Sequence, residues 1–149
     1  MNITVIIATK NRYHDLHKCL NSLLEQTRLP QKIVIVDASE PFHTLEEFET
    51  RCRKKKIELL QIKSKPGLTL QRNIGIEHAS TEIVSFFDDD VILHKEYLQS
   101  IVEIFEADSG KRIGGVTGKI LNQTDFHPLS ILLRKIFLLP EPSKGEVKP

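Results

Sequence analysis

Hydrophobic positions along the chain change repeatedly from short apolar runs to stripes at helical spacing. The apolar runs predict buried strands over 3–8, 33–36, 57–62 and 83–87. The stripes predict helices over 16–24, 45–56, 68–79 and 97–105. This alternation indicates an α/β fold with a mostly parallel sheet, a central first strand, right-handed crossovers and helices on both faces. A further strand, with glycines that permit close backbone approach, is expected over 114–121.

Polar clusters directly follow three of the predicted strands, namely the turn 9–12, Asp37 and Asp88–Asp90. Ligands of such sheets bind beyond the carboxyl ends of the strands, so these clusters are expected to converge on one edge. The turn after the first strand contains no glycine, which argues against a dinucleotide-dependent hydride-transfer enzyme, and no P-loop is present either. Phosphate would have to be held by a metal and by side chains. Asn11 or Asp15 is expected to cap the following helix.

The three consecutive carboxylates Asp88–Asp90 require a positive partner at the end of a buried strand. Carboxylate oxygens suit Mg²⁺ or Mn²⁺, and a sparse carboxylate site leaves coordination positions open for the oxygens of a diphosphate. The alternative is an acidic turn, in which Asp90 or a neighbour caps the following helix and the others are solvated.

The composition narrows the class of protein. A length of 149 residues indicates one domain. The net charge of +1 gives no argument for a nucleic-acid partner. Cys19 and Cys52 lie far apart and fit no metal spacing, so both are interpreted as reduced thiols. The N-terminus runs into a strand without a charged leader or a long apolar segment, which argues against export and against a membrane span. We therefore expect a cytoplasmic protein.

Six segments occur in the order and at the spacing of a known family. They are Thr4–Arg12, Leu20–Thr27, Ile33–Ser39, Gly67–Ile76, Phe86–Asp90 and Gly114–Gly118. On these segments the chain resembles the family 2 glycosyltransferases. The resemblance implies the GT-A fold, a Rossmann-like sheet, and transfer of a sugar from a nucleotide-diphosphate sugar donor.

The resemblance also implies which residues hold the nucleoside of the donor. These are Ala8, Thr9, Asn11 and Arg12 after the first strand and Asp37 after the second. Asp37 would accept the imide N–H of a uracil or thymine. Its alternative role is to cap the next helix. Many family members carry a second acid directly after this one, where this chain has Ala38, so the resemblance does not define the contacts to base and ribose.

Arg72 and Asn73 resemble the family's Arg-Asn-x-Gly element, which helps to hold the donor. Arg72 would offset diphosphate charge or would pair structurally with Asp88, and the residues leave both open. The family's Asp-x-Asp metal motif maps to Asp88 and Asp90, with Asp89 in the variable position, and the resemblance places Asp88 and Asp89 near the donor. A bound Mg²⁺ or Mn²⁺ would bridge the phosphates and stabilise the leaving nucleoside diphosphate.

Family members invert the anomeric centre and need a carboxylate base for the acceptor hydroxyl. In the family this base follows the metal motif, whereas past Gly118 the chain has only Asp125, Glu141 and Glu146, none in the family context. Residues 1–122 are therefore interpreted as the donor-binding core, and residues 123–149 as the start of an acceptor region that looks incomplete and truncated.

We expect an inverting transferase that uses a UDP-sugar and a saccharide or lipid-linked acceptor in bacterial surface polysaccharide synthesis. The alternative is a non-catalytic nucleotide-sugar-binding module that lacks the base. A sugar-phosphate nucleotidyltransferase is disfavoured, because the glycine-rich basic loop of those enzymes is missing. The amphipathic segment Leu129–Leu139 would dock on the fold, bind peripherally to the inner face of the membrane, or form a homo-oligomer.

Overall fold

The computed structural model describes residues 1–119, and strands and helices alternate strictly along them. The elements are β1 (Ile3–Thr9), α1 (Tyr13–Leu24), β2 (Lys32–Asp37), α2 (Glu46–Lys54), β3 (Glu58–Lys63), α3 (Leu68–Glu77), β4 (Ile83–Asp88) and α4 (Tyr97–Ala107). All of them lie within one compact unit, residues 1–114. The predicted order of elements is confirmed, with boundaries that differ by a few residues.

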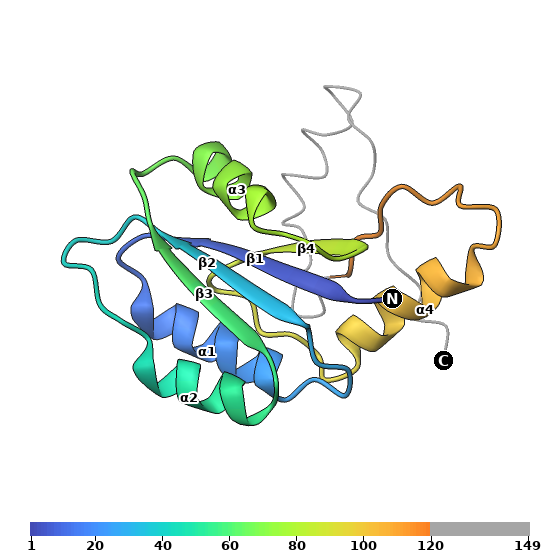
Figure 1. The fold of residues 1–149 in the computed structure, drawn as a ribbon, viewed down its shortest axis with the longest axis horizontal. Coiled ribbons are helices and arrows are strands. Elements are labelled where there is room, and N and C mark those ends of the chain that lie inside the picture. The colour runs from blue at the N-terminus through green and yellow to red at the C-terminus, as the bar shows by residue number, and fades with distance from the viewer. Residues whose placement is uncertain (120–149) are drawn as a thin grey trace, which may run out of the picture. The chain divides into compact units, whose positions relative to one another are not determined.

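The strands of this unit form a parallel sheet in the order β3-β2-β1-β4. Helices α1 and α2 cover one face and α3 covers the other (Figure 1). Thr9 at the end of β1 is level with Asp37 of β2, and Ala8 is level with Asp88 of β4. Strand β1 thus lies between β2 and β4, and the carboxyl ends of the parallel strands meet at one edge, as predicted for an α/β fold of this kind.

The core explains why the central strands are nearly continuous apolar runs. Strands β1 and β2 are covered on both faces, and residues 33–36 of β2 are fully buried. On α1, the side chains of Leu16, Cys19 and Leu23 are all 0% exposed, so the predicted apolar stripe faces the sheet. On the other face, Gly75 of α3 lies directly against Ile6 of β1, since a Cβ built on Gly75 would be 2.3 Å from Ile6 Cγ2.

Two expectations from the sequence are wrong in the described residues. The strand expected over 114–121 is not formed at residues 114–119, and positions 120–121 lie outside the described part of the chain. Glycines at 114 and 115 contribute no side chain that packs, and a Cβ on either would meet nothing within 4 Å. The N-cap of α1 is Arg12 and makes no side-chain cap hydrogen bond, so neither Asn11 nor Asp15 caps this helix.

Some further interpretations concern residues outside the described range. The acceptor region 123–149 and the segment Leu129–Leu139 both lie there. Within residues 1–119, no helix combines the length and the apolar character needed to cross a membrane.

Candidate functional site

The turn after β1 is fixed to the residues that follow β2. Asn11 adopts a left-handed backbone conformation with φ of 57°, which asparagine tolerates better than most residues. Its amide N–H donates to Ser39 Oγ at 2.7 Å, and its Oδ1 accepts from the Glu40 amide at 2.9 Å. These hydrogen bonds join the two loops into one rim at the carboxyl edge of the sheet.

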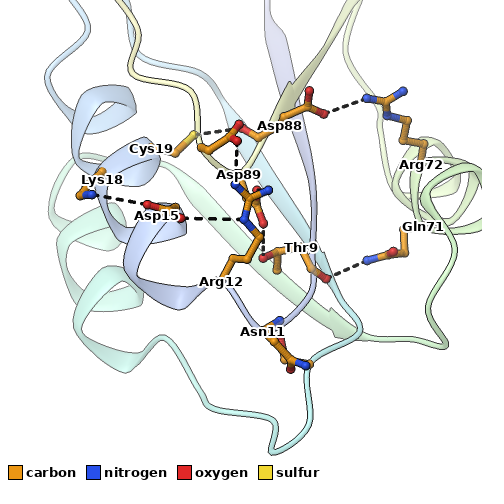
Figure 2. A network of polar contacts seen from close by, with 12 residues as sticks. Thr9, Asn11, Arg12, Asp15, Lys18, Cys19, Gln71, Arg72, Asp88 and Asp89 are labelled. Atoms are coloured by element: carbon orange, nitrogen blue, oxygen red, sulfur yellow. Dashed lines mark hydrogen bonds and ion pairs between the residues drawn. The ribbon is translucent and has the colours of Figure 1, made fainter.

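The three carboxylates after β4 have different environments. The side chains of Asp88 and Asp90 are 63% and 50% exposed, whereas that of Asp89 is 5% exposed. Asp89 accepts a hydrogen bond from Thr9 Oγ1 at 2.8 Å and pairs with Arg12 Nη1 at 2.9 Å (Figure 2). Burial raises the pKa of Asp89, against the opposing effects of the Thr9 hydrogen bond and the Arg12 charge. Asp89 thus lies beneath the edge, where it anchors β1 to the loop after β4.

Two arginines supply positive charge to the exposed carboxylates. Arg12 Nη2 lies 2.6 Å from Asp90 Oδ2, and Arg72 Nη2 of α3 lies 3.0 Å from Asp88 Oδ1. The structural pair between Arg72 and Asp88, one of the two roles expected for this arginine, is therefore present (Figure 2). The alternative in which Asp90 or a neighbour caps the next helix is wrong, because α4 begins after Glu96 without a side-chain cap.

The exposed carboxylates of Asp88 and Asp90 fit a divalent ion only if a bound substrate supplies further ligands. Asp88 and Asp90 supply hard oxygen ligands, but among residues 1–119 no group of three or more His, Cys, Asp or Glu side chains is arranged so that it could hold a metal ion by itself. The nearby Cys19 thiol lies 3.8 Å from the Asp88 carbonyl, and burial raises the pKa of this thiol to about 12, so it stays protonated. Mg²⁺ is often held by one or two carboxylates plus substrate phosphates, and this donor set suits that arrangement.

Asp37 is completely buried at the end of β2. Its carboxylate accepts hydrogen bonds from the Ser39 amide at 2.8 Å, the Tyr13 hydroxyl at 2.7 Å and Gln61 Nε2 at 3.1 Å. Burial is the main cause that raises the pKa of the Tyr13 phenol, and the hydrogen bond to Asp37 raises it further. The alternative role of Asp37 as a helix cap is wrong, because α2 begins after Leu45 without a side-chain cap. The imide contact stays a prediction.

A hollow of about 620 Å³ opens at the carboxyl ends of β1, β2 and β3. It is lined by Lys10, Asn11, Ala38, Glu40, Lys63, Ser64, Lys65 and Pro66. Three lysines and one glutamate give this lining a positive balance of charge. Ala38, where the family resemblance suggested a second acid, contributes only a methyl group to the wall.

Gln71 is a site residue that the sequence analysis missed. Its side-chain amide is buried and donates to the carbonyl of Thr9 at 2.9 Å (Figure 2). The same amide donates to the carbonyl of Val36 at 2.7 Å. Its Oε1 accepts from the amide of Gly67, whose φ of 151° favours glycine. Gln71 therefore joins the start of α3 to the ends of β1 and β2. The available signal was its position four residues before Gly75, on the helix face that packs on the sheet.

Of the residues predicted to hold the donor, the structure brings most to one edge. Thr9 and Arg12 both contact Asp89, and Ala8 is level with Asp88 in the sheet. Asn11 lines the hollow. Arg72 joins this edge through Asp88, and the neighbouring Asn73 is exposed on α3. Asp37 and Asp89 are also at this edge, but their carboxylates are buried below its surface.

Comparison with known proteins identifies the family. The family model for "Glycosyl transferase family 2" matches residues 4–145 of this chain. The chain is 30% identical over 118 residues to glycosyltransferase AglE of Haloferax volcanii, covering 76% of this chain and 38% of AglE. It is 25% identical to poly(ribitol-phosphate) beta-N-acetylglucosaminyltransferase TarP of Staphylococcus aureus, covering 98% of this chain and 51% of TarP.

A solved structure agrees with this match. The crystal structure of S. aureus TarS in complex with UDP-GlcNAc has 26% sequence identity and a TM-score of 0.59, and covers 83% of this chain and 37% of that one. The chain thus spans about half or less of the length of these relatives. Since the family match covers nearly the whole sequence and the described sheet has the GT-A topology, the chain belongs to glycosyl transferase family 2.

Proposed function

We propose that the carboxyl edge of this sheet binds a nucleotide-diphosphate sugar, with uridine as the nucleoside, and that the whole protein transfers the sugar to a hydroxyl of a saccharide or lipid-linked acceptor. One observation carries the proposal. The exposed carboxylates of Asp88 and Asp90 lie at the same edge as a hollow of about 620 Å³ lined by the neighbouring strand ends. The relatives TarS, solved with UDP-GlcNAc, and TarP, named for N-acetylglucosaminyl transfer, support the choice of donor.

Each part of the donor has a chemically suitable partner in this arrangement. The base would enter the hollow, and the diphosphate would lie toward Asp88 and Asp90. These two carboxylates would hold Mg²⁺ or Mn²⁺ together with phosphate oxygens, and the ion would stabilise the charge of the leaving nucleoside diphosphate. Arg12 pairs with both Asp89 and Asp90, and Arg72 pairs with Asp88. The remaining N–H groups of the two arginines would offset phosphate charge.

An inverting displacement also needs a base for the acceptor hydroxyl. The carboxylates of the edge are poorly suited to this task. Asp37 and Asp89 are buried, Asp88 and Asp90 are paired with arginines, and Glu40 lines the hollow assigned to the nucleobase. We therefore propose that the base lies outside residues 1–119. The same observation favours a second candidate function, a module that binds the nucleotide sugar without turning it over.

Titration calorimetry with UDP, GDP and dTDP, each with and without Mn²⁺, tests the proposal. We expect Mn²⁺-dependent binding of UDP, and loss of the Mn²⁺ effect in Asp90→Ala. Asp108→Ala removes a carboxylate at the end of α4 and serves as the matched control. A folded protein that binds none of the three nucleotides would refute the proposal. Release of UDP from UDP-GlcNAc in the presence of acceptor saccharides then separates a transferase from a binding module.

A further inference from the structure

The carboxylate of Asp37 is the centre of a hydrogen-bond network that the proposed donor contacts do not explain. The residue is 0% exposed and accepts hydrogen bonds from Ser39, Tyr13 and Gln61 at 2.7–3.1 Å. An ionised carboxylate offers about four acceptor positions, so three of them are used inside the protein. Asp37 is also absent from the residues that line the hollow. Little of its acceptor capacity is therefore directed at a ligand.

A second layer of the network holds the two side-chain donors in place. The Tyr13 hydroxyl accepts from the amide of His43 at 2.9 Å, and Gln61 Nε2 also donates to the His43 carbonyl at 2.9 Å. The rings of Tyr13 and His43 meet edge to face, with centroids 5.1 Å apart. Tyr13 begins α1, Gln61 lies in β3 and His43 lies between β2 and α2. The network thus joins three segments around one buried charge.

The network reaches the hollow through short steps. Ser39 donates its amide to Asp37, and its hydroxyl oxygen accepts from the amide of Asn11 at 2.7 Å. Asn11 in turn accepts from the amide of Glu40 at 2.9 Å, and both Asn11 and Glu40 line the hollow. On the opposite side, Gln61 lies two residues before Lys63, which also lines it. Hydrogen bonds thus connect Tyr13 and Gln61 to the rim through Asp37 and Ser39.

We propose that Tyr13 and Gln61 are positioning residues for the base of the donor. They hold Asp37 in its buried position, and through Ser39 they fix the rim formed by Asn11 and Glu40. The Asp37 carboxylate then acts on the base indirectly and makes no contact with its imide. This inference rests on the proposed function, because it requires the base to occupy the hollow, and it replaces the direct imide contact that the family resemblance suggested.

The first test compares the two tyrosines of the chain. Tyr13→Phe removes the donor to Asp37 and the acceptor for His43, and we expect UDP affinity to fall about tenfold, the loss of one hydrogen bond to a charged group. Tyr97→Phe is the matched control, because Tyr97 has no part in the Asp37 network. Its ring lies on α4 and packs on the Phe87 ring of β4, with centroids 5.6 Å apart. Circular dichroism of both variants establishes that they are folded. Equal UDP affinity in the two variants would overturn the inference.

A second test separates positioning from direct contact with the base. UDP and N3-methyl-UDP are titrated into wild type and into Asp37→Asn. If Asp37 accepted the imide proton, the penalty of the methyl group would largely vanish in the variant. The positioning role predicts the same penalty in both proteins, within about threefold. If Asp37→Asn does not fold, the UDP affinities of Tyr13→Phe and Gln61→Leu decide instead.

The outcomes distinguish the inference from the proposed function. Wild type that binds no UDP would refute the donor site and the inference with it. Wild type that binds UDP, with a methyl penalty that disappears in the variant, would refute only the positioning role. Gln61→Leu provides an independent arm, with Gln99→Leu as its control, because Gln99 donates to Glu103 on the exposed side of α4. Weaker UDP binding in Gln61→Leu alone supports the inference, and equal binding contradicts it.

Discussion

Replacement of Gly75 by alanine should destabilise the domain, although the same change in an ordinary helix stabilises it. In a helix interior, alanine is favoured over glycine by about 1 kcal/mol. At Gly75, however, the new Cβ would lie 2.3 Å from Ile6 Cγ2 and 3.3 Å from two further carbons of the same side chain. Ile6 is 1% exposed and packs with Val34 and Val36 in the core, so it can make room only by displacing its neighbours.

The clash therefore outweighs the helix preference. Overpacking of a core costs typically about 1–3 kcal/mol, and the shift needed here places Gly75→Ala toward the upper end. After subtraction of the gain in helix preference, we expect a net loss of about 1–2 kcal/mol. With a urea m-value of about 2 kcal/mol/M, this lowers the midpoint of unfolding by about 0.5–1 M.

The assay is urea unfolding followed by circular dichroism, with Gly114→Ala as the matched control. A Cβ on Gly114 would meet no atom within 4 Å, so this substitution should leave the midpoint unchanged. A Gly75→Ala protein as stable as wild type, or more stable, would show that α3 does not pack on β1 as closely as described. The contacts of Gln71 and Arg72 with the edge of the sheet would then be in doubt as well, since both residues lie on α3.

Three further predictions concern buried side chains near the edge. Gln71→Ala removes two hydrogen bonds to strand carbonyls, so it should lower the free energy of unfolding in urea by about 2 kcal/mol and weaken UDP binding. The matched control is Gln26→Ala, which removes a buried amide that donates to the carbonyls of Ser22 and His94. This control should destabilise the protein without changing UDP affinity. Burial raises the pKa of Asp89, so its ionised form lowers the stability of the folded protein at neutral pH. Wild type should therefore gain stability relative to Asp89→Asn as the pH falls through that pKa. A relative loss of stability would contradict this. The thiol of Cys19, buried and with a pKa raised to about 12, should resist alkylation until urea unfolds the protein; rapid reaction of the native protein would refute its burial.

The sequence predicted the sheet well because its strands are encoded locally. The apolar run of β1 and the run that ends at Asp88 need no partner to be recognised, and parallel order follows from the alternation with helices. The meeting of Arg12, Asp37 and the acidic cluster at one edge followed from topology alone. The strand expected over 114–121 is absent at the described residues 114–119, because an apolar pattern shows the preference of a segment but not whether a neighbouring strand pairs with it.

The roles of individual polar side chains were harder to predict. Gln71 bonds to Thr9, 62 residues away, and the Tyr13 hydroxyl bonds to Asp37, 24 residues away. Such partners depend on how helices are placed over the sheet, which residue spacing does not encode. For the same reason, the middle carboxylate Asp89 could not be recognised as buried while its neighbours stay exposed. Burial there depends on Thr9 and Arg12 from the other end of the unit's sequence.

The measurement that tests the donor site most directly is a map of amide chemical-shift changes on addition of UDP with Mg²⁺. The account predicts that the largest changes cluster at the carboxyl edge, in the turn 10–12, the loop 38–40, the loop 63–66 and the acidic tip 88–90. Amides of α4 should change little. Changes concentrated in α4 or at the amino ends of the strands, with the carboxyl edge unaffected, would contradict the assignment of this edge as the donor site.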